Sequence, residues 1–268
     1  MAFDGAKVPE IQGHTINTMQ PSSPAPTEMP STMTAASLLH HRLRSDILLG
    51  KLEPGAKLTL TSLSRTYDAG MIPLREALNR LSAEGLVTQH DQRGFFVCEI
   101  SKEDVIDLTQ TRCWLYEGAL REAIRKGGQE WENEIVLSFY RLSKIPRYKD
   151  EKSGEINHDW TAPHRRFHTA LIAACGSRRT IEISENLFDQ AERYRNLARL
   201  TELKPTVHDE HRLIMDAVLQ RDADAAVSSL LEHLQSTCAV VVRALDARHQ
   251  LAVKSKARQK ERSKERQP

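Results

Sequence analysis

In the first third of the chain, apolar residues recur with the period of a helix and then give way to a β-prone stretch. The helical period predicts helices over residues 35–49 and 60–67, and a third helix that begins at Gly70 and ends before Gly85. Residues 86–97 surround a polar turn with β-prone residues, which indicates a hairpin. Three helices followed by a hairpin are typical of a winged helix-turn-helix, a fold that binds DNA.

The third of these helices is the candidate for reading DNA. Its apolar residues fall at i, i+3, i+4 and i+7, so they form one buried stripe and leave Arg75 and Asn79 on the outer face. An outward arginine near the start of such a helix can give paired hydrogen bonds to guanine, and Asn79 can address a base edge or a phosphate. Periodicity alone fits an ordinary amphipathic helix equally well, but the order of elements favours DNA recognition. The buried stripe consists of Leu74, Ala77, Leu78 and Leu81.

The rest of the chain is predicted to be helical, with polar, proline-containing or glycine-containing separators such as the polar stretch over residues 144–155. The fold class is therefore mainly α: a winged helix-turn-helix followed by an all-α helical bundle. The predicted helices of the bundle cover residues 103–126, 131–142, 159–174, 180–200, 206–219 and 223–247.

Composition divides the 268 residues into four regions. An extension rich in Pro, Ser, Thr and Met is predicted to be disordered, and a basic tail is predicted to be a solvated helical extension or a floppy arm. The regions are residues 1–34 (extension), 35–100 (winged helix-turn-helix), 101–248 (ligand-binding and dimerisation bundle) and 249–268 (tail).

Charge and cysteine usage indicate a cytoplasmic protein without a membrane span. The net charge is +2, and the tail holds seven Lys or Arg against two Glu, so the body is weakly acidic and DNA affinity would depend on placed arginines. The four cysteines show no C-x-x-C spacing, which favours reduced thiols. No apolar run approaches about 18 residues, and the first residues lack a signal-peptide pattern.

Four of the eleven histidines lie on apolar stripes of the predicted bundle, where an unpartnered imidazole is costly to bury. His164 and His168 are four residues apart and point inward from adjacent turns of one helix. His211 and His233 occupy inward positions on two later helices. Four imidazoles can form the first shell of a divalent transition metal such as Zn²⁺. Alternatively, each is a hydrogen-bonded core histidine.

Two arginines in the segment AERYRNLARL are candidates for an anionic ligand. Arg193 and Arg195 could pair with carboxylates, because guanidinium groups bind carboxylates through paired hydrogen bonds. An ordinary surface position is favoured for Arg195, whereas for Arg193 the two interpretations are balanced.

Residues 50–97 resemble the DNA-binding domain of the GntR family of bacterial regulators. The family pattern G-x-L-x-P-G-x-x-L, then P-V-R-E-A-L-x-x-L-x-x-E-G-L-V, then R-G-x-x-V, is matched at nearly every position. The resemblance implies that Arg75, Arg93 and Gly94 belong to the DNA contact, and Arg65 and Thr61 are weaker candidates for phosphate binding. The matching residues are Gly50, Leu52, Pro54, Gly55, Leu58, Pro73, Arg75, Glu76, Ala77, Leu78, Leu81, Glu84, Gly85, Leu86, Val87, Arg93, Gly94 and Val97.

One departure from the family pattern lies just before the recognition helix. Family members usually carry a Ser-Arg or Thr-Arg pair there, and this chain has Gly70 and Met71 instead. One arginine of the family's DNA contact is therefore missing.

The bundle resembles the FCD-type effector domain of the FadR-like GntR subgroup. That subgroup shows D-x-x-x-H, then a histidine in an E-H-x-x-[IL] context, then a histidine on the last helix. The resemblance implies that His168, His211 and His233 are metal ligands, with His164 in the usual aspartate position. It also implies that Arg112 belongs to the effector pocket, while the usual glutamate is replaced by Tyr116.

The resulting expectation is a metabolite-responsive transcriptional repressor. A homodimer would bind a near-palindromic operator, and a small carboxylate at the metal would release it. One alternative is a metal-dependent enzyme with a histidine-ligated zinc. The chain has no HExxH helix, no nucleophile elbow and no glycine-rich phosphate loop, so we expect no enzyme activity. Another alternative is a DNA-binding protein with a purely structural dimerisation bundle, which metal content would distinguish.

Overall fold

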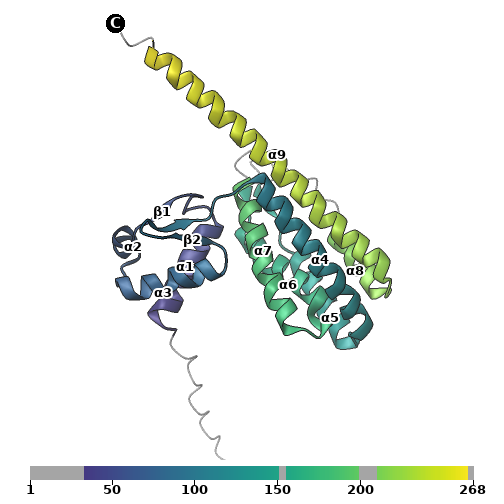
Figure 1. The fold of residues 1–268 in the computed structure, drawn as a ribbon. Coiled ribbons are helices and arrows are strands. Elements are labelled where there is room, and N and C mark those ends of the chain that lie inside the picture. Colours follow the sequence, from purple (N-terminus) through teal and green to yellow (C-terminus); the bar gives the residue numbers. More distant parts are fainter. Residues whose placement is uncertain (1–32, 151–154, 199–209, 265–268) are drawn as a thin grey trace, which may run out of the picture. The chain divides into compact units, whose positions relative to one another are not determined.

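The computed structural model describes residues 33–150, 155–198 and 210–264 (Figure 1). The predicted extension over residues 1–34 lies almost wholly outside this range, as do the start of the helix predicted from residue 206 and the last residues of the chain. The fold is mainly helical with a small antiparallel sheet, as predicted.

The first folded region is a winged helix-turn-helix. Helices α1 (Ala35–Leu48), α2 (Leu60–Tyr67) and α3 (Met71–Ala83) precede the hairpin of β2 (Val87–His90) and β3 (Gly94–Val97). Strand β1 (Lys57–Leu58), which the sequence pattern did not reveal, pairs with β3 and gives the sheet order β1-β3-β2. One apolar core joins these helices and strands, so the outer face of α3 is left for contacts with other molecules.

The local sequence explains where these helices begin. Thr34 and Thr59 accept hydrogen bonds from backbone amides in the first turns of α1 and α2, which is the usual N-cap arrangement. Gly70 precedes α3 without a side-chain cap, and Pro73 stands in the first turn, where a missing amide donor costs little. The starts of all three helices are therefore encoded locally.

The second folded region is a helical bundle (Figure 1). Its core is built mainly from apolar residues of α4, α5, α6, α8 and α9. Helix α4 packs along α9 and also contacts α6 and α7, whereas α8 packs on α9. The helices are α4 (Lys102–Lys126), α5 (Gln129–Ser143), α6 (Thr161–Ile172), α7 (Arg178–Ala198), α8 (Glu210–Leu219) and α9 (Ala223–Lys264).

Two short segments differ from the predicted pattern. The polar stretch over residues 144–155 contains a small hairpin, β4 (Tyr148–Asp150) and β5 (Glu155–Ile156). Helix α6 is shorter than predicted because 3₁₀ turns, His158–Trp160 and Ala173–Cys175, replace its ends. Periodicity does not distinguish a 3₁₀ turn from the end of an α-helix.

Helix α9 extends through most of the basic tail, so residues 249–264 continue a helix and do not form a separate arm. Its Ala223–Arg248 portion is long and apolar enough to cross a membrane by length and composition alone, a test that the core helix of a soluble protein also passes. Buried residues of α9, including Ala226, Leu230 and Leu234, belong to the bundle core. Packing in the bundle therefore accounts for part of the apolarity of this portion, of which 39% is buried.

Candidate functional site

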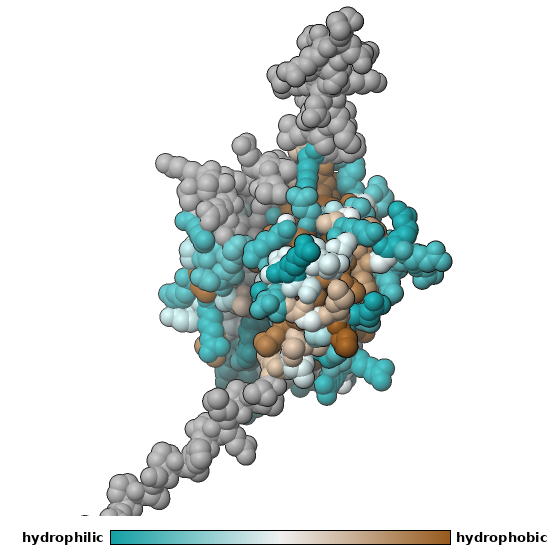
Figure 2. Space-filling model, turned by 90° about the vertical axis from the view of Figure 1, so that its left-hand side faces the viewer, coloured by the Kyte–Doolittle hydropathy of each residue, from teal (hydrophilic) through white to brown (hydrophobic). Residues whose placement is uncertain are grey.

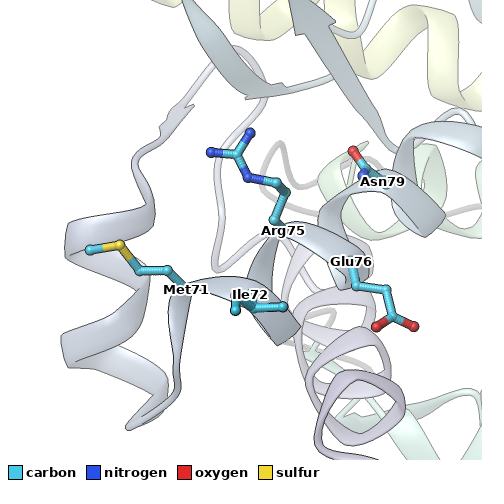
Figure 3. Close-up of a pocket in the computed structure, with 5 residues that line it drawn as sticks. All are labelled: Met71, Ile72, Arg75, Glu76 and Asn79. Atoms are coloured by element: carbon cyan, nitrogen blue, oxygen red, sulfur yellow. The ribbon is translucent and has the colours of Figure 1, made fainter.

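Helix α3 presents a polar face to solvent, as its pattern predicted. Its four stripe residues are fully buried, whereas Arg75 and Asn79 are exposed. Figure 3 shows both side chains beside Met71, Ile72 and Glu76, around an open surface hollow. The stripe positions are Leu74, Ala77, Leu78 and Leu81.

The two arginines on the exposed face of α3 differ in whether they already form an ion pair within the protein. Arg80 forms an ion pair with Glu76 at 2.5 Å and donates a hydrogen bond to Ser37. Within the described residues, the Arg75 guanidinium has no such ion pair or hydrogen bond. Arg75 is therefore the arginine on this face that is free to bind an incoming partner.

The wing follows α3, and its turn depends on the backbone of two residues. Gln92 and Gly94 adopt positive φ angles of 59° and 88°, and the Arg93 amide donates to the His90 carbonyl at 3.1 Å. A residue other than glycine would be strained at φ +88°, so Gly94 shapes the turn that presents exposed Arg93. Thr61 and Arg65 are exposed on α2.

The four predicted histidines meet inside the bundle. Helix α6 contributes His164 and His168, α8 contributes His211, and α9 contributes His233. One nitrogen atom from each lies within 4.8 Å of the other three. The Nε2 atom of His164 lies 3.0 Å from Nε2 of His168 and 3.1 Å from Nε2 of His211.

Hydrogen bonding alone does not satisfy this cluster. A neutral imidazole Nε2 carries either one proton or one lone pair, so Nε2 of His164 can form one hydrogen bond and not two. Among the described residues, Nδ1 of His164, Nδ1 of His168 and Nε2 of His233 also lack hydrogen-bond partners. Buried polar atoms without partners are costly, which indicates that the cluster accommodates another group.

The donor set fits a metal ion. Tetrahedral coordination at about 2.0–2.1 Å places ligand nitrogens roughly 3.3 Å apart, close to the 3.0 and 3.1 Å separations around His164. The Nδ1 atom of His233 lies 2.6 Å from Oε2 of Glu210, so a carboxylate orients this imidazole and leaves its Nε2 toward the cluster. The cluster can therefore hold a metal.

Burial favours the neutral form of the four imidazoles. Burial lowers the pKa of His164, His168 and His211 well below its usual range, and the positive charges of neighbouring groups lower it further. Burial also lowers the pKa of His233, although the hydrogen bond to Glu210 opposes that change. A neutral imidazole has the lone pair that a metal requires.

Two buried arginines lie next to the histidines around the ring of Phe188. This ring is 5.2 Å from His164, and the guanidinium carbons of Arg112 and Arg195 lie 5.9 and 5.0 Å from the ring centroid. Nε and Nη2 of Arg112 have no hydrogen-bond partner among the described residues. Arg195 is paired with Glu192 at 2.5 Å, so Arg112 is the less compensated charge.

The structure separates Arg193 from this cluster. Its guanidinium donates to the backbone carbonyl of Cys98, at the end of the wing strand, instead of contacting the histidines. Tyr116, in the position of the family glutamate, is buried with its ring 6.2 Å from that of His168. Arg112 thus lies beside the histidine cluster, whereas Arg193 does not.

Sequence reasoning missed three residues around the cluster. Arg195 was expected on the surface but is 6 % exposed, and its position seven residues after Phe188 on α7 was an available signal. Arg147 stacks over Trp160 at 5.2 Å, and that indole stacks on His164 at 4.0 Å. Arg147 lies in an irregular stretch without a helical signal, whereas the position of Glu210 directly before a candidate ligand could have revealed it.

Comparison with known proteins matches both halves of the chain. Residues 36–97 match the family described as bacterial regulatory proteins, gntR family, and residues 107–236 match the FCD domain. The HTH-type transcriptional repressor GlaR of Escherichia coli (strain K12) is 35% identical over 219 residues, which cover 80% of this chain and 99% of GlaR. The uncharacterized HTH-type transcriptional regulator BphR of Paraburkholderia xenovorans (strain LB400) is 36% identical over 222 residues, which cover 82% of this chain and 89% of BphR.

Solved structures share the fold at lower sequence identity. E. coli McbR/YncC has a TM-score of 0.64 and 18% identity, covering 79% of this chain and 99% of its own. A putative transcriptional regulator GntR from Rhodococcus sp. RHA1 has a TM-score of 0.60 and 22% identity, and the match covers 78% of this chain and 98% of the Rhodococcus chain. These likenesses support the arrangement of helices and the small sheet described above.

Proposed function

Because the chain belongs to the GntR family of bacterial regulatory proteins, it is a DNA-binding transcriptional regulator and not an enzyme, and we propose that it is a repressor released from its operator by a small carboxylate. The observation that carries the effector half of this proposal is the buried cluster of four imidazoles next to Arg112, whose Nε and Nη2 atoms lack hydrogen-bond partners among the described residues. Repression agrees with the likeness to GlaR, which is a transcriptional repressor.

The four imidazoles would hold a divalent cation, for which zinc suits the all-nitrogen set. When bound, such a cation would supply positive charge that attracts a carboxylate oxygen. Four neutral ligands leave its charge uncompensated in the first shell, and Glu210 offsets only part of it through His233. Arg112 adds a second positive group that can pair with the same anion.

On the DNA side, Arg75 and Arg93 would contact the operator, with Asn79 beside Arg75 and with Thr61 and Arg65 near phosphates. The Gly94 turn would present the wing to the duplex. We propose that the regulator acts in the cytoplasm, where bacterial DNA is found. The extension, the winged helix-turn-helix, the bundle and the tail would be four functional regions, with residues 249–264 of the tail continuing helix α9.

Replacing Arg75 with alanine tests whether α3 reads DNA. We expect operator affinity to fall about 5- to 150-fold, equivalent to about 1–3 kcal/mol, because a bidentate contact to guanine is lost. The probe is the tightest-binding duplex selected from a random-sequence library, and the measurement is fluorescence anisotropy at one salt concentration. Arg178→Ala is the matched control, because it removes one exposed, ion-paired arginine from α7. Equal affinity for Arg75→Ala and Arg178→Ala would contradict the assignment.

A homodimer agrees with the apolar surface of α4. Ile106 and Trp114 lie about two turns apart on this helix and are 53 % and 67 % exposed. A second copy of the chain would cover them and place two winged helices on a near-palindromic operator.

Introducing a charge at this surface should separate the two copies. We expect Trp114→Glu to shift the protein from dimer to monomer, because a carboxylate would be buried without a partner. Analytical ultracentrifugation over a concentration series measures the change. Leu213→Glu, at an exposed apolar position on α8, is the control. A Trp114→Glu protein that stays dimeric at every concentration would show that α4 is not the interface.

A further inference from the structure

The start of the recognition helix exposes two large apolar side chains. Ile72 is 84 % exposed, the largest value among the large hydrophobic residues of the described chain, and its neighbour Met71 is 53 % exposed. Figure 3 shows both at the hollow that Arg75 lines. Figure 2 shows hydrophobic residues exposed among hydrophilic ones on one face of the molecule. Core packing leaves these two side chains without a described partner.

Ile72 lies on the same face of the helix as the polar residues. Ile72, Arg75, Glu76 and Asn79 fall at i, i+3, i+4 and i+7, which is a second stripe on the side opposite the buried one. A stripe of this kind holds neighbours on one face of a helix. Ile72 therefore stands at the N-terminal end of the same surface that presents Arg75 and Asn79.

The major groove offers one apolar feature to such a surface. Thymine carries a C5-methyl group there, and apolar side chains contact it, whereas the other major-groove base edges present hydrogen-bond donors and acceptors. The first residues of a recognition helix are the ones that reach base edges. The chain also has Gly70 and Met71 in place of the polar pair usual in its family, so an apolar side chain stands where the family usually has an arginine.

We propose that Ile72, assisted by Met71, reads a thymine methyl group in each operator half-site, next to the base that Arg75 contacts. This proposal rests on the proposed function, because it requires α3 to enter the major groove. Ile72 and Arg75 are three residues apart, which is about 4.5 Å along the helix axis at 1.5 Å per residue. Base pairs follow one another at about 3.4 Å, so the thymine should lie one or two base pairs from that base.

The direct test replaces thymine with deoxyuridine in the selected duplex, which removes the methyl group and leaves the hydrogen-bonding groups of the base unchanged. For the unmodified protein, we expect each such replacement to weaken binding about fourfold, the factor that corresponds to about 0.8 kcal/mol for one buried methyl group. Replacement in both half-sites should therefore weaken binding about 15-fold. The same replacement should have no effect on Ile72→Ala, because its methyl contact is already absent.

Two further variants serve as controls for the comparison of thymine and deoxyuridine duplexes. Ile72→Val keeps a branched apolar side chain and should retain most of the sensitivity to deoxyuridine. Leu213→Ala removes an exposed apolar side chain from α8 and should bind the thymine and deoxyuridine duplexes as the unmodified protein does. All four proteins are compared at one salt concentration.

The outcomes separate this inference from the proposed function. If Arg75→Ala loses affinity but no thymine replacement affects the unmodified protein, Ile72 does not read a methyl group and the function stands. Equal sensitivity of Ile72→Ala and the unmodified protein to deoxyuridine would also overturn the inference. If Arg75→Ala binds as tightly as the unmodified protein, the placement of α3 in the groove is itself wrong.

Discussion

Replacing His168 with alanine should remove the bound metal from the purified protein and lower its melting temperature. His168 is 1 % exposed, and its Nε2 lies 3.0 Å from Nε2 of His164, so no other described side chain can take its place in the cluster without rearrangement. A ligand that binds only the native state stabilises it by about 2.7 kcal/mol when its concentration is 100 times its dissociation constant. For a chain of this size, that loss corresponds to a fall of roughly 5–10 °C.

Metal analysis by mass spectrometry and thermal unfolding with and without a chelator measure these effects. The chelator should lower the melting temperature of the unmodified protein and leave that of His168→Ala unchanged, which separates metal loss from the cavity that the substitution creates. His158→Ala is the control, because His158 is exposed on the turn just before α6. Its metal content should match that of the unmodified protein.

A metal-free protein that a chelator leaves equally stable would contradict the prediction. The four histidines would then be core residues, and the bundle would serve dimerisation alone. That interpretation has to explain how Nε2 of His164 contacts two other Nε2 atoms when it can form only one hydrogen bond. The metal experiment therefore decides between the two interpretations that the sequence left open.

The parts of the fold that sequence predicted well are those encoded by local periodicity. The stripe of α3 and the inward positions of His164 and His168 follow from spacing within one helix, and the structure buries both sets. His211 and His233 were also predicted from their own helices, but their approach to α6 depends on packing between elements. The resemblance to a known domain supplied that information in place of periodicity.

The parts that sequence could not predict depend on neighbours far along the chain. Arg193 and Arg195 are two residues apart, and yet one contacts Cys98 while the other lies against Phe188. Both residues are arginines on the same helix, so the sequence gives them the same tendency to be exposed. Only the rotation of α7 within the bundle distinguishes their surroundings. The burial of Arg147 depends likewise on Trp160, in a stretch where no repeating pattern fixes the direction of a side chain.

Replacing Arg112 with alanine should abolish release of DNA by the effector while operator binding stays within about twofold of normal. Arg112 is 3 % exposed and lies in the bundle, whereas the proposed DNA contacts lie on α3 and the wing. Removing one partner of a buried, hydrogen-bonded charge pair costs about 2–5 kcal/mol, so carboxylate affinity should fall at least about 30-fold. A ligand shifts an equilibrium only through its differential affinity for the two states, and typical coupling amounts to about 1–3 kcal/mol.

The measurement is anisotropy of the selected duplex, titrated with a panel of aliphatic acids, sugar acids and aromatic acids until one releases the unmodified protein. That acid is then applied to three variants at the same salt concentration. Arg112→Ala should keep the metal but fail to release DNA, because the imidazoles remain while the second anionic contact is lost. His168→Ala should lose both the metal and release, and Arg178→Ala should lose neither. If Arg112→Ala still releases DNA at the acid concentration that suffices for the unmodified protein, the effector does not bind beside this guanidinium, whatever metal the histidines hold.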